Sequence, residues 1–196
     1  LDLRGRVVLF LQVLDAVSYA HGSLVVHRDL KPSNLMVSGS GQVKLLDFGI
    51  ARELEQAGLA ATATGDRAMT LQYASPEQLH NLPVTTATDI YQLGVVLYRL
   101  LAGGHPFGIE ADTPLARQLH ALSQEPEPIT HSARQADATV AGRRGQTPAS
   151  LARALDGCLE AIVHACLRKD PSARYASAEA MANDRRAWLD DRPVVA

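Results

Sequence analysis

Four polar side chains near the start of the chain have the types that phosphoryl transfer requires: Asp29, Lys31, Asn34 and Asp47. The first three belong to the string His-Arg-Asp-Leu-Lys-Pro-Ser-Asn, and the fourth begins the string Asp-Phe-Gly. Phosphoryl transfer needs positioned reactants, metal ions that bridge the phosphates and a base beside the attacking hydroxyl. Asp29 suits the base, and Lys31 could stabilise charge on the phosphoryl group. Asn34 and Asp47 suit metal ligation.

Three further strings follow along the chain: Tyr-Ala-Ser-Pro-Glu at residues 73–77, Asp-Ile-Tyr-Gln-Leu-Gly at residues 89–94 and Asp-Pro-Ser-Ala-Arg-Tyr at residues 170–175. The pair Asp29 and Asn34 alone would be a weak signal, because both residue types are common in turns. Five strings in this order resemble the motifs of serine/threonine protein kinases. The sequence Tyr-Ala-Ser-Pro-Glu-Gln, with Arg-Pro-Val near the end of the chain, is similar to the corresponding sequences of bacterial eukaryotic-like kinases.

The resemblance implies a reaction and its cofactors. ATP and Mg²⁺ would bind, and a hydroxyl of a protein substrate would receive the phosphoryl group. Lys31 at its distance from Asp29 resembles the serine/threonine class rather than the tyrosine class, and Thr70 would bridge these two residues near the incoming hydroxyl. Nucleotide and metal would be bound by Lys31, Ser33, Asn34, Met36 and Asp47, with the metal held by Asn34 and Asp47. Met36 would form the floor under the adenine ring, with plain core packing as the alternative.

Other positions would support these residues. Asp89 is either a first-turn carboxylate favoured by the helix dipole or the buried Asp that in this family holds the backbone of the catalytic loop. The motif around it favours the second interpretation. Arg174 is placed to form a buried ion pair with Glu77, which would tie the preceding segment to the last helices. The remaining supporting positions are His27, expected to pack beneath Phe48, together with Arg28 and Gly49.

Residues 51–77 match the position of the activation segment of kinases. Residues 51–76 are rich in Ala, Thr and Gly and lack a sustained hydrophobic period, so we expect a mobile loop. Thr62 and Thr64 are its candidate phosphate acceptors, and Arg28 could pair with a phosphothreonine there. An unmodified loop that faces solvent is the alternative.

Hydrophobic periodicity predicts a mainly α fold with a short β-hairpin. The resemblance implies a helical bundle like the C-terminal lobe of protein kinases, in which this hairpin carries the catalytic and metal-binding loops. The domain is expected to cover residues 1–192, with residues 193–196 starting a linker. Helices are predicted over residues 6–21, 86–102, 150–169 and 177–189, strands over residues 35–37 and 43–46, and a long loop or insertion over residues 124–149. The segment 86–102 is apolar on nearly all faces and should be the buried central helix. The arginines of the long loop, Arg134, Arg143 and Arg144, are expected to be solvated.

The small N-terminal lobe of kinases has no counterpart in this sequence. We find no glycine-rich loop over the phosphates and no strand lysine in a Val-Ala-Ile-Lys setting, although both anchor the nucleotide in kinases. We therefore expect an N-terminal lobe in cis as a partner, and weak or absent activity of this segment alone. The alternative is a non-catalytic, truncated kinase that acts as a scaffold. A small-molecule kinase of related fold is disfavoured by Lys31 and by the Ser-Pro-Glu segment.

Composition narrows the function classes further. The formal net charge of −2 gives no reason to expect nucleic acid as a partner. Cys158 and Cys166 lie in one helical pattern, roughly 12 Å apart, which is too far for a disulfide. No run approaches the length of a membrane-spanning helix. We expect a cytoplasmic location, with membrane attachment only through segments outside this sequence.

Overall fold

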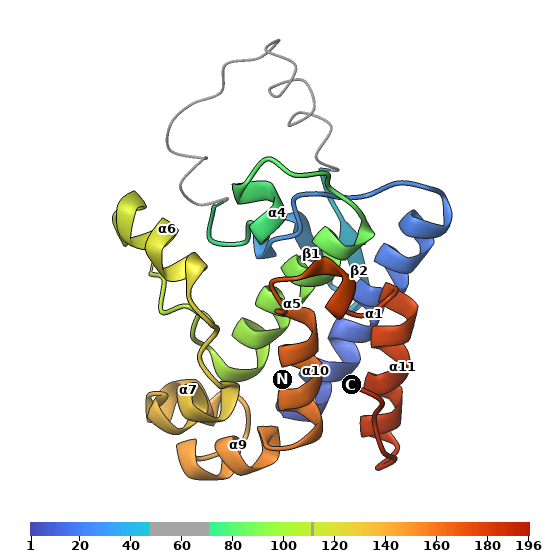
Figure 1. The fold of residues 1–196 in the computed structure, drawn as a ribbon. Helices are drawn as coiled ribbons and strands as arrows, with labels where there is room; N and C mark the ends of the chain where they lie inside the picture. The colour runs from blue at the N-terminus through green and yellow to red at the C-terminus, as the bar shows by residue number, and fades with distance from the viewer. Residues whose placement is uncertain (48–70, 111) are drawn as a thin grey trace.

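The computed structural model describes residues 1–47, 71–110 and 112–196, which form a helical bundle with one two-stranded sheet (Figure 1). Its core consists of α1 (Leu3–Gly22), α5 (Thr86–Ala102), α10 (Cys158–Cys166) and α11 (Ala178–Leu189), which pack against one another. The other elements are β1 (Leu35–Val37), β2 (Val43–Leu45), α4 (Pro76–Leu79), α6 (Leu115–Ser123), α7 (Ile129–Gln135), α8 (Ala138–Gly142) and α9 (Pro148–Leu155), with 3₁₀ turns at Pro32–Asn34 and Pro171–Ala173. The mainly α architecture with a short hairpin is the one that the sequence predicted.

Helix α5 is the central element, as expected from its composition. Thirteen of its 17 residues are buried, including polar side chains. Thr85 and Thr88 form a capping box at its first turn, and Gly103 ends it in the left-handed conformation with φ 97°. At Gly94 the helix approaches α10 so closely that a Cβ would lie 2.6 Å from Cys166 Cβ. The bundle therefore requires glycine at this contact.

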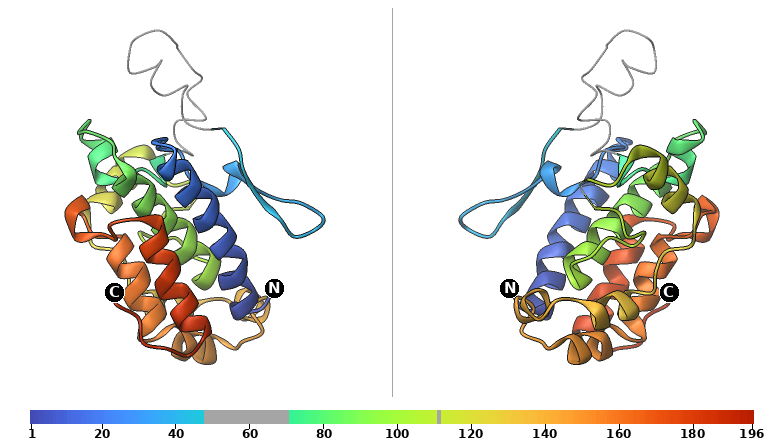
Figure 2. Two further views of the ribbon diagram at one scale, coloured as in Figure 1. Left: turned by 90° about the vertical axis from the view of Figure 1, so that its right-hand side faces the viewer. Right: turned by 90° about the vertical axis from the view of Figure 1, so that its left-hand side faces the viewer.

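The hairpin lies beside α1 and projects from the flank of the bundle (Figure 2). Strands β1 and β2 pair antiparallel, with Leu35 opposite Leu45 and Val37 opposite Val43. The turn is closed by hydrogen bonds from Ser38 N to Gln42 O and from Gly41 N to Ser38 O, both 2.9 Å. Because β1 and β2 are short and paired, the segment that precedes β1 and the segment that follows β2 lie close together.

The long loop predicted over residues 124–149 is wrong, because most of this segment is helical. It contains α7, α8 and the start of α9, with Ile129, Ala133 and Ala141 buried. Two polar residues in this segment are N-caps: Asp137 accepts from Thr139 N at 2.7 Å, and Thr147 forms a capping box. Helices α7 and α8 are so short that only one or two of their apolar residues are buried, too few to give a visible period.

Arg144 contradicts the expected solvated loop most directly. Its side chain is buried and donates to the carbonyls of Arg99, Leu100 and Leu101, which lie in the last turn of α5. The last carbonyls of a helix lack backbone donors from the helix itself, and here Arg99 O also accepts from Gly103 N at 2.9 Å. The Arg144 guanidinium therefore acts as a side-chain cap at the C-terminus of α5. Burial lowers the pKa of Arg144 to about 10, with Arg6 and Arg143 adding to the effect.

The helical pattern over residues 150–169 is divided into α9 and α10. Gly157, with φ 78°, lies between the two helices and permits the change of direction. Cys158 and Cys166 fall within α10 and are both free thiols.

Helix α6, which was not predicted, stands apart from the core of the bundle in Figure 1. None of the helices in the described part of the chain is long and apolar enough to cross a membrane.

Arg185 on α11 is an unusual core residue. Its side chain is fully buried, and none of its three guanidinium nitrogens has a hydrogen-bond partner among the described residues. The guanidinium carbon lies 4.8 Å from the centre of the Phe10 ring, a cation–π contact between α11 and α1. Burial lowers the pKa of Arg185 to about 10. An unpaired buried cation destabilises a fold unless its contacts offset the cost of desolvation.

We predict that Arg185→Met raises the free energy of unfolding by about 1–3 kcal/mol, because a side chain of similar length then fills the site without a charge. Urea unfolding of the parent and the variant measures the difference. Arg186→Met is the matched control: this neighbour is exposed and pairs with exposed Asp15, so its loss should cost less than about 1 kcal/mol. A destabilised Arg185→Met protein would show that the contact with Phe10 outweighs the desolvation.

Candidate active site

The segment 27–34 is held to the bundle by Asp89 in the first turn of α5. The Asp89 carboxylate is fully buried and accepts two backbone hydrogen bonds of 2.8 Å, from His27 N to Oδ2 and from Arg28 N to Oδ1. Arg28 has φ 69°, a conformation that costs a non-glycine residue roughly 1–2 kcal/mol. The two bonds offset this cost and hold the chain in the bend that precedes Asp29.

Three residues outside the predicted set also hold this segment. His21, in the last turn of α1, lies with Nε2 2.8 Å from Asp89 Oδ2. Gln92 on α5 accepts from Leu30 N at 2.8 Å and donates to Arg28 O at 2.9 Å, and Gln78 on α4 donates to the same carbonyl at 2.8 Å. A signal for Gln92 was present in the sequence, because it is a polar residue in the most apolar segment of the chain.

Asp29, Lys31 and Asn34 are brought together. Lys31 Nζ lies 3.0 Å from Asp29 Oδ2, and Asn34 Nδ2 donates to Asp29 O at 2.8 Å and to Asp29 Oδ2 at 3.1 Å. The side chains of Asp29 and Lys31 are 17% and 20% exposed, so the carboxylate is accessible at one edge only. One carboxylate is thus flanked by an ammonium and an amide.

Asp47 lies two residues after the end of β2, and that end of the strand is tied to the same segment. Leu46 N donates to Asn34 O at 2.9 Å, and His27 Nε2 lies 3.0 Å from Leu46 O. The backbone register therefore places Asp47 next to the Asn34 segment, with Asp47 exposed and in the left-handed conformation at φ 48°. Whether the side chains of Asp47 and Asn34 share a metal ion stays a prediction.

The other nucleotide-binding candidates lie just before the hairpin and on its first strand. Ser33 is exposed within the 3₁₀ turn, and Met36 is half exposed on β1 opposite Lys44. Their proposed contacts with nucleotide stay predictions. Five predicted site residues lie outside the described residues: Phe48, Gly49, Thr62, Thr64 and Thr70. The expected packing of His27 beneath Phe48 therefore stays a prediction. His27 itself is fully buried.

Glu77 and Arg174 form a buried, two-point ion pair. Arg174 Nη1 lies 2.7 Å from Glu77 Oε1 and Nη2 lies 2.9 Å from Oε2, while Thr88 Oγ1 donates to Oε1 at 2.7 Å. Arg174 also donates to the carbonyls of Arg168, Lys169 and Ala87. Burial alone would raise the pKa of Glu77, but hydrogen bonds from Arg174, Thr88 and the backbone hold it below its usual value. The pair joins α4 to the turn between α10 and α11.

His105 anchors the chain just before α4. Its ring is buried, Nε2 lies 2.8 Å from Gln72 O, and Nδ1 accepts from Phe107 N at 3.2 Å. This arrangement fits a neutral ring with its proton on Nε2. Burial, offset partly by the bond to Gln72 and reinforced by Arg99, lowers the pKa of His105 to about 4.

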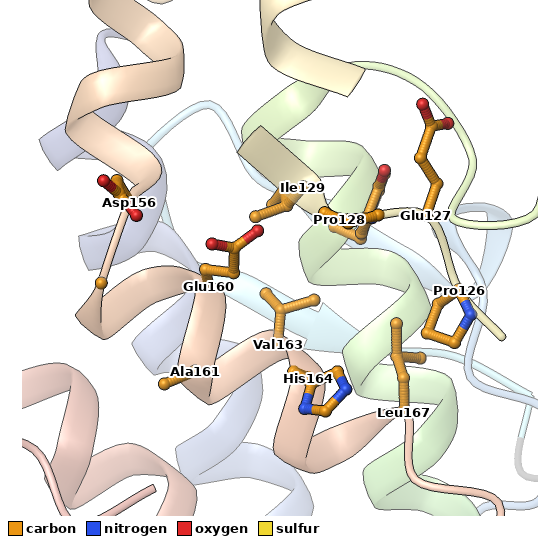
Figure 3. Close-up of a pocket in the computed structure, with 12 residues that line it drawn as sticks. Pro126, Glu127, Pro128, Ile129, Asp156, Glu160, Ala161, Val163, His164 and Leu167 are labelled. Carbon is orange, nitrogen blue, oxygen red and sulfur yellow. The ribbon is translucent and has the colours of Figure 1, made fainter. Parts of the chain in front are cut away.

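Two pockets lie elsewhere on the described surface. The first has a volume of about 510 Å³ and lies between α10, residues 126–129 and Tyr98 of α5 (Figure 3). Two carboxylates at its edge already have partners: Glu127 pairs with His131, and Glu160 accepts from Thr130 Oγ1 at 2.9 Å. The second, of about 310 Å³, is an apolar hollow between α1, the hairpin and α5. Neither is lined by Asp29, Asn34 or Asp47.

We predict that the Glu77–Arg174 pair is strongly coupled. Glu77→Gln or Arg174→Met should each cost about 3–5 kcal/mol of the free energy of unfolding, because each leaves a buried charge without its partner. The double variant should lose clearly less than the sum, as measured by urea unfolding in a double-mutant cycle. The exposed pair Arg186–Asp15 serves as the control, with expected coupling below about 1 kcal/mol. Additive losses at Glu77 and Arg174 would contradict the prediction.

We also predict that His105 makes the fold acid-sensitive. Its pKa is about 4 in the folded chain and about 6.5 when unfolded, so the unfolded chain gains a proton first as the pH falls. Stability contributed by neutral His105 is present above pH 6.5 and is lost between about pH 6.5 and 4, on the order of 3 kcal/mol. His105→Gln can still donate to Gln72 O but cannot titrate, so its stability should fall less over this range. Equal pH dependence in the two proteins would refute this.

Comparison with known proteins gives a consistent assignment. The family model of the protein kinase domain matches residues 4–185. The chain is 37% identical, over 93% of its length, to a probable serine/threonine-protein kinase of Streptomyces coelicolor. It is 35% identical over 92% of its length to the serine/threonine-protein kinase PknB of Mycolicibacterium smegmatis, and 34% identical over 86% to PknB of Mycobacterium tuberculosis.

The chain spans about a quarter of the length of these relatives, 24% to 26%. The match nevertheless includes the segment 27–34, the hairpin and the Glu77–Arg174 pair, and it extends from α1 into α11. By sequence and by the extent of this match, the chain belongs to the protein kinase domain family.

Proposed function

We propose that this chain contributes the chemical centre of a serine/threonine protein kinase, which transfers the γ-phosphoryl group of ATP to a hydroxyl of a protein substrate. The observation that carries the proposal is the cluster at Asp29, whose carboxylate contacts both Lys31 Nζ and Asn34 Nδ2 within 3.1 Å. A base in contact with a cation and with an amide ligand supplies the parts that this reaction requires.

Each residue of the cluster has a distinct role. Asp29 accepts or orients the proton of the attacking hydroxyl. Lys31, held beside Asp29, stabilises negative charge on the transferring group. Thr70 is proposed to bridge Asp29 and Lys31 near the substrate, from a part of the chain outside the described residues.

The donor set fits magnesium. The amide nitrogen of Asn34 is engaged with Asp29, so its amide oxygen is the atom that remains for a metal. Together with the Asp47 carboxylate it would supply the hard oxygen ligands that Mg²⁺ prefers, and the ion would neutralise charge on the phosphates. Within residues 1–47, 71–110 and 112–196, no group of three His, Cys, Asp or Glu side chains could hold a metal. Because Mg²⁺ takes an octahedral set of ligands and usually keeps waters and phosphates among them, phosphate oxygens of the nucleotide would complete the coordination.

The described bundle corresponds, in this proposal, to the larger C-terminal lobe of the kinase domain. An N-terminal lobe in cis would cover the adenine ring over Met36, which is half exposed on β1, and would anchor the α- and β-phosphates. Residues 51–77 would form the regulatory segment, with Thr62 and Thr64 as phosphate acceptors and Arg28 as their partner. The proposed location is the cytoplasm, with residues 193–196 leading into a linker.

A scaffold without catalysis is the second candidate. It is disfavoured by the intact contacts of Asp29 with Lys31 and Asn34. The two functions differ in one measurement, because only the kinase incorporates phosphate from ATP in the presence of Mg²⁺.

We predict that Asp29→Asn in the complete encoded protein lowers phosphate transfer at least about 100-fold, because a neutral amide cannot act as the base. The measurement is incorporation of labelled γ-phosphate into the protein itself and into casein. Asp15→Asn, which neutralises an exposed carboxylate on α1, should leave transfer unchanged. Thermal melting of both variants checks that the fold is retained. Undiminished transfer by Asp29→Asn would rule out the assigned role.

A further inference from the structure

The side-chain amide of Gln92 brackets Asp29. Its Oε1 accepts from Leu30 N at 2.8 Å, and its Nε2 donates to Arg28 O at 2.9 Å. These two groups belong to the peptide units on either side of Asp29. Gln92 is 1% exposed and projects from the rigid, buried helix α5, so its amide has little freedom to follow a moving loop. The bracket therefore limits rotation of the backbone at Asp29.

Gln78 connects the same bracket to α4. Its Nε2 donates to Arg28 O at 2.8 Å, and its Oε1 accepts from Gln92 Nε2 at 3.0 Å. The same oxygen accepts from Ser75 N at 3.1 Å, within the capping box of α4. Arg28 O thus receives two donors, and a continuous chain of hydrogen bonds runs from the first residue of the α4 cap to Leu30.

The strained backbone at Arg28 explains why such a clamp is needed. A non-glycine residue with φ 69° stays in that conformation only when its surroundings over-determine it. Asp89 fixes the nitrogen side of Arg28, through His27 N and Arg28 N. The two glutamines fix the carbonyl side. Without them, the carbonyl side of Arg28 loses two donors, and the peptide that leads into Asp29 can rotate.

We infer that Gln92 and Gln78 are positioning residues that set the orientation of Asp29 and make it depend on the position of α4. The inference rests on the proposed function for its catalytic consequence. Since α4 begins at the end of the segment 51–77, any event that shifts α4 would be transmitted to the peptides around Asp29 through these two amides. Neither glutamine touches the reacting atoms.

The test compares Gln92→Met with Gln118→Met in the complete encoded protein. Methionine keeps the length of glutamine but removes its hydrogen bonds. Gln118 is an equally buried glutamine on α6, and its amide donates to Thr113 O at 2.7 Å. We expect Gln92→Met to lower kcat roughly 10- to 100-fold with KM for ATP nearly unchanged, because a small misplacement of a catalytic group has a large effect. Gln118→Met should keep the parent kcat even where its melting temperature falls.

The shared carbonyl provides a second readout. Gln78→Met alone should lower kcat less than Gln92→Met, because Gln92 still binds both peptides. The double variant should depart from the product of the two single effects, since both amides act on Arg28 O. Independent, multiplicative effects would show that α4 is not coupled to Asp29 through this carbonyl.

A third readout does not depend on activity. Hydrogen exchange at the Leu30 amide should be faster in Gln92→Met than in the parent and in Gln118→Met. Unchanged exchange at Leu30, or a kcat for Gln92→Met equal to that of Gln118→Met, would overturn the inference. A parent that transfers no phosphate would instead refute the proposed function, and the exchange at Leu30 would still decide whether the clamp exists.

Discussion

The described structure depends on one constraint: the backbone of residues 27–30 must keep a strained bend, and polar side chains of a buried helix hold it there. Asp89 and Gln92 project from α5 and satisfy backbone groups on both sides of Arg28. In an apolar interior these bonds are hard to replace, because a buried polar group without a partner is costly. The position of Asp29 is therefore set by the packing of α5.

The same helix also organises the second anchor. Thr88, one residue before Asp89, donates to Glu77, whose carboxylate is paired with Arg174. One turn of α5 thus contacts the segment 27–30, α4 and the turn after α10. These contacts are buried and share one helix, so α4 and the segment that contains Asp29 are anchored to the same turn of α5.

Much of this arrangement could be predicted from the sequence. The apolar run 86–102, the hairpin and the terminal helices have periods long enough to indicate their type, and the strings around Asp29 and Glu77 indicate which residues meet. The sequence could not show which buried side chains form hydrogen bonds with backbone groups far away in the chain. Arg144 and Gln92 are of residue types that usually lie on the protein surface, yet both are buried and donate to backbone carbonyls. The apolar surroundings of Gln92 in the sequence indicate a buried polar residue, but the carbonyls that both side chains bind are remote in sequence, so no local pattern indicates the partners.

The hairpin fixes the relative position of the two proposed metal ligands before a metal or nucleotide binds. One backbone hydrogen bond, from Leu46 N to Asn34 O, joins Asn34 to the residue just before Asp47. The orientation of Asn34 is further fixed by its two bonds to Asp29, while Asp47 is exposed and has only its backbone set by the register. One proposed ligand is therefore preorganised and the other can adjust by side-chain rotation. Such a pair suits an ion that arrives with its phosphates, since the bound nucleotide then selects the final arrangement.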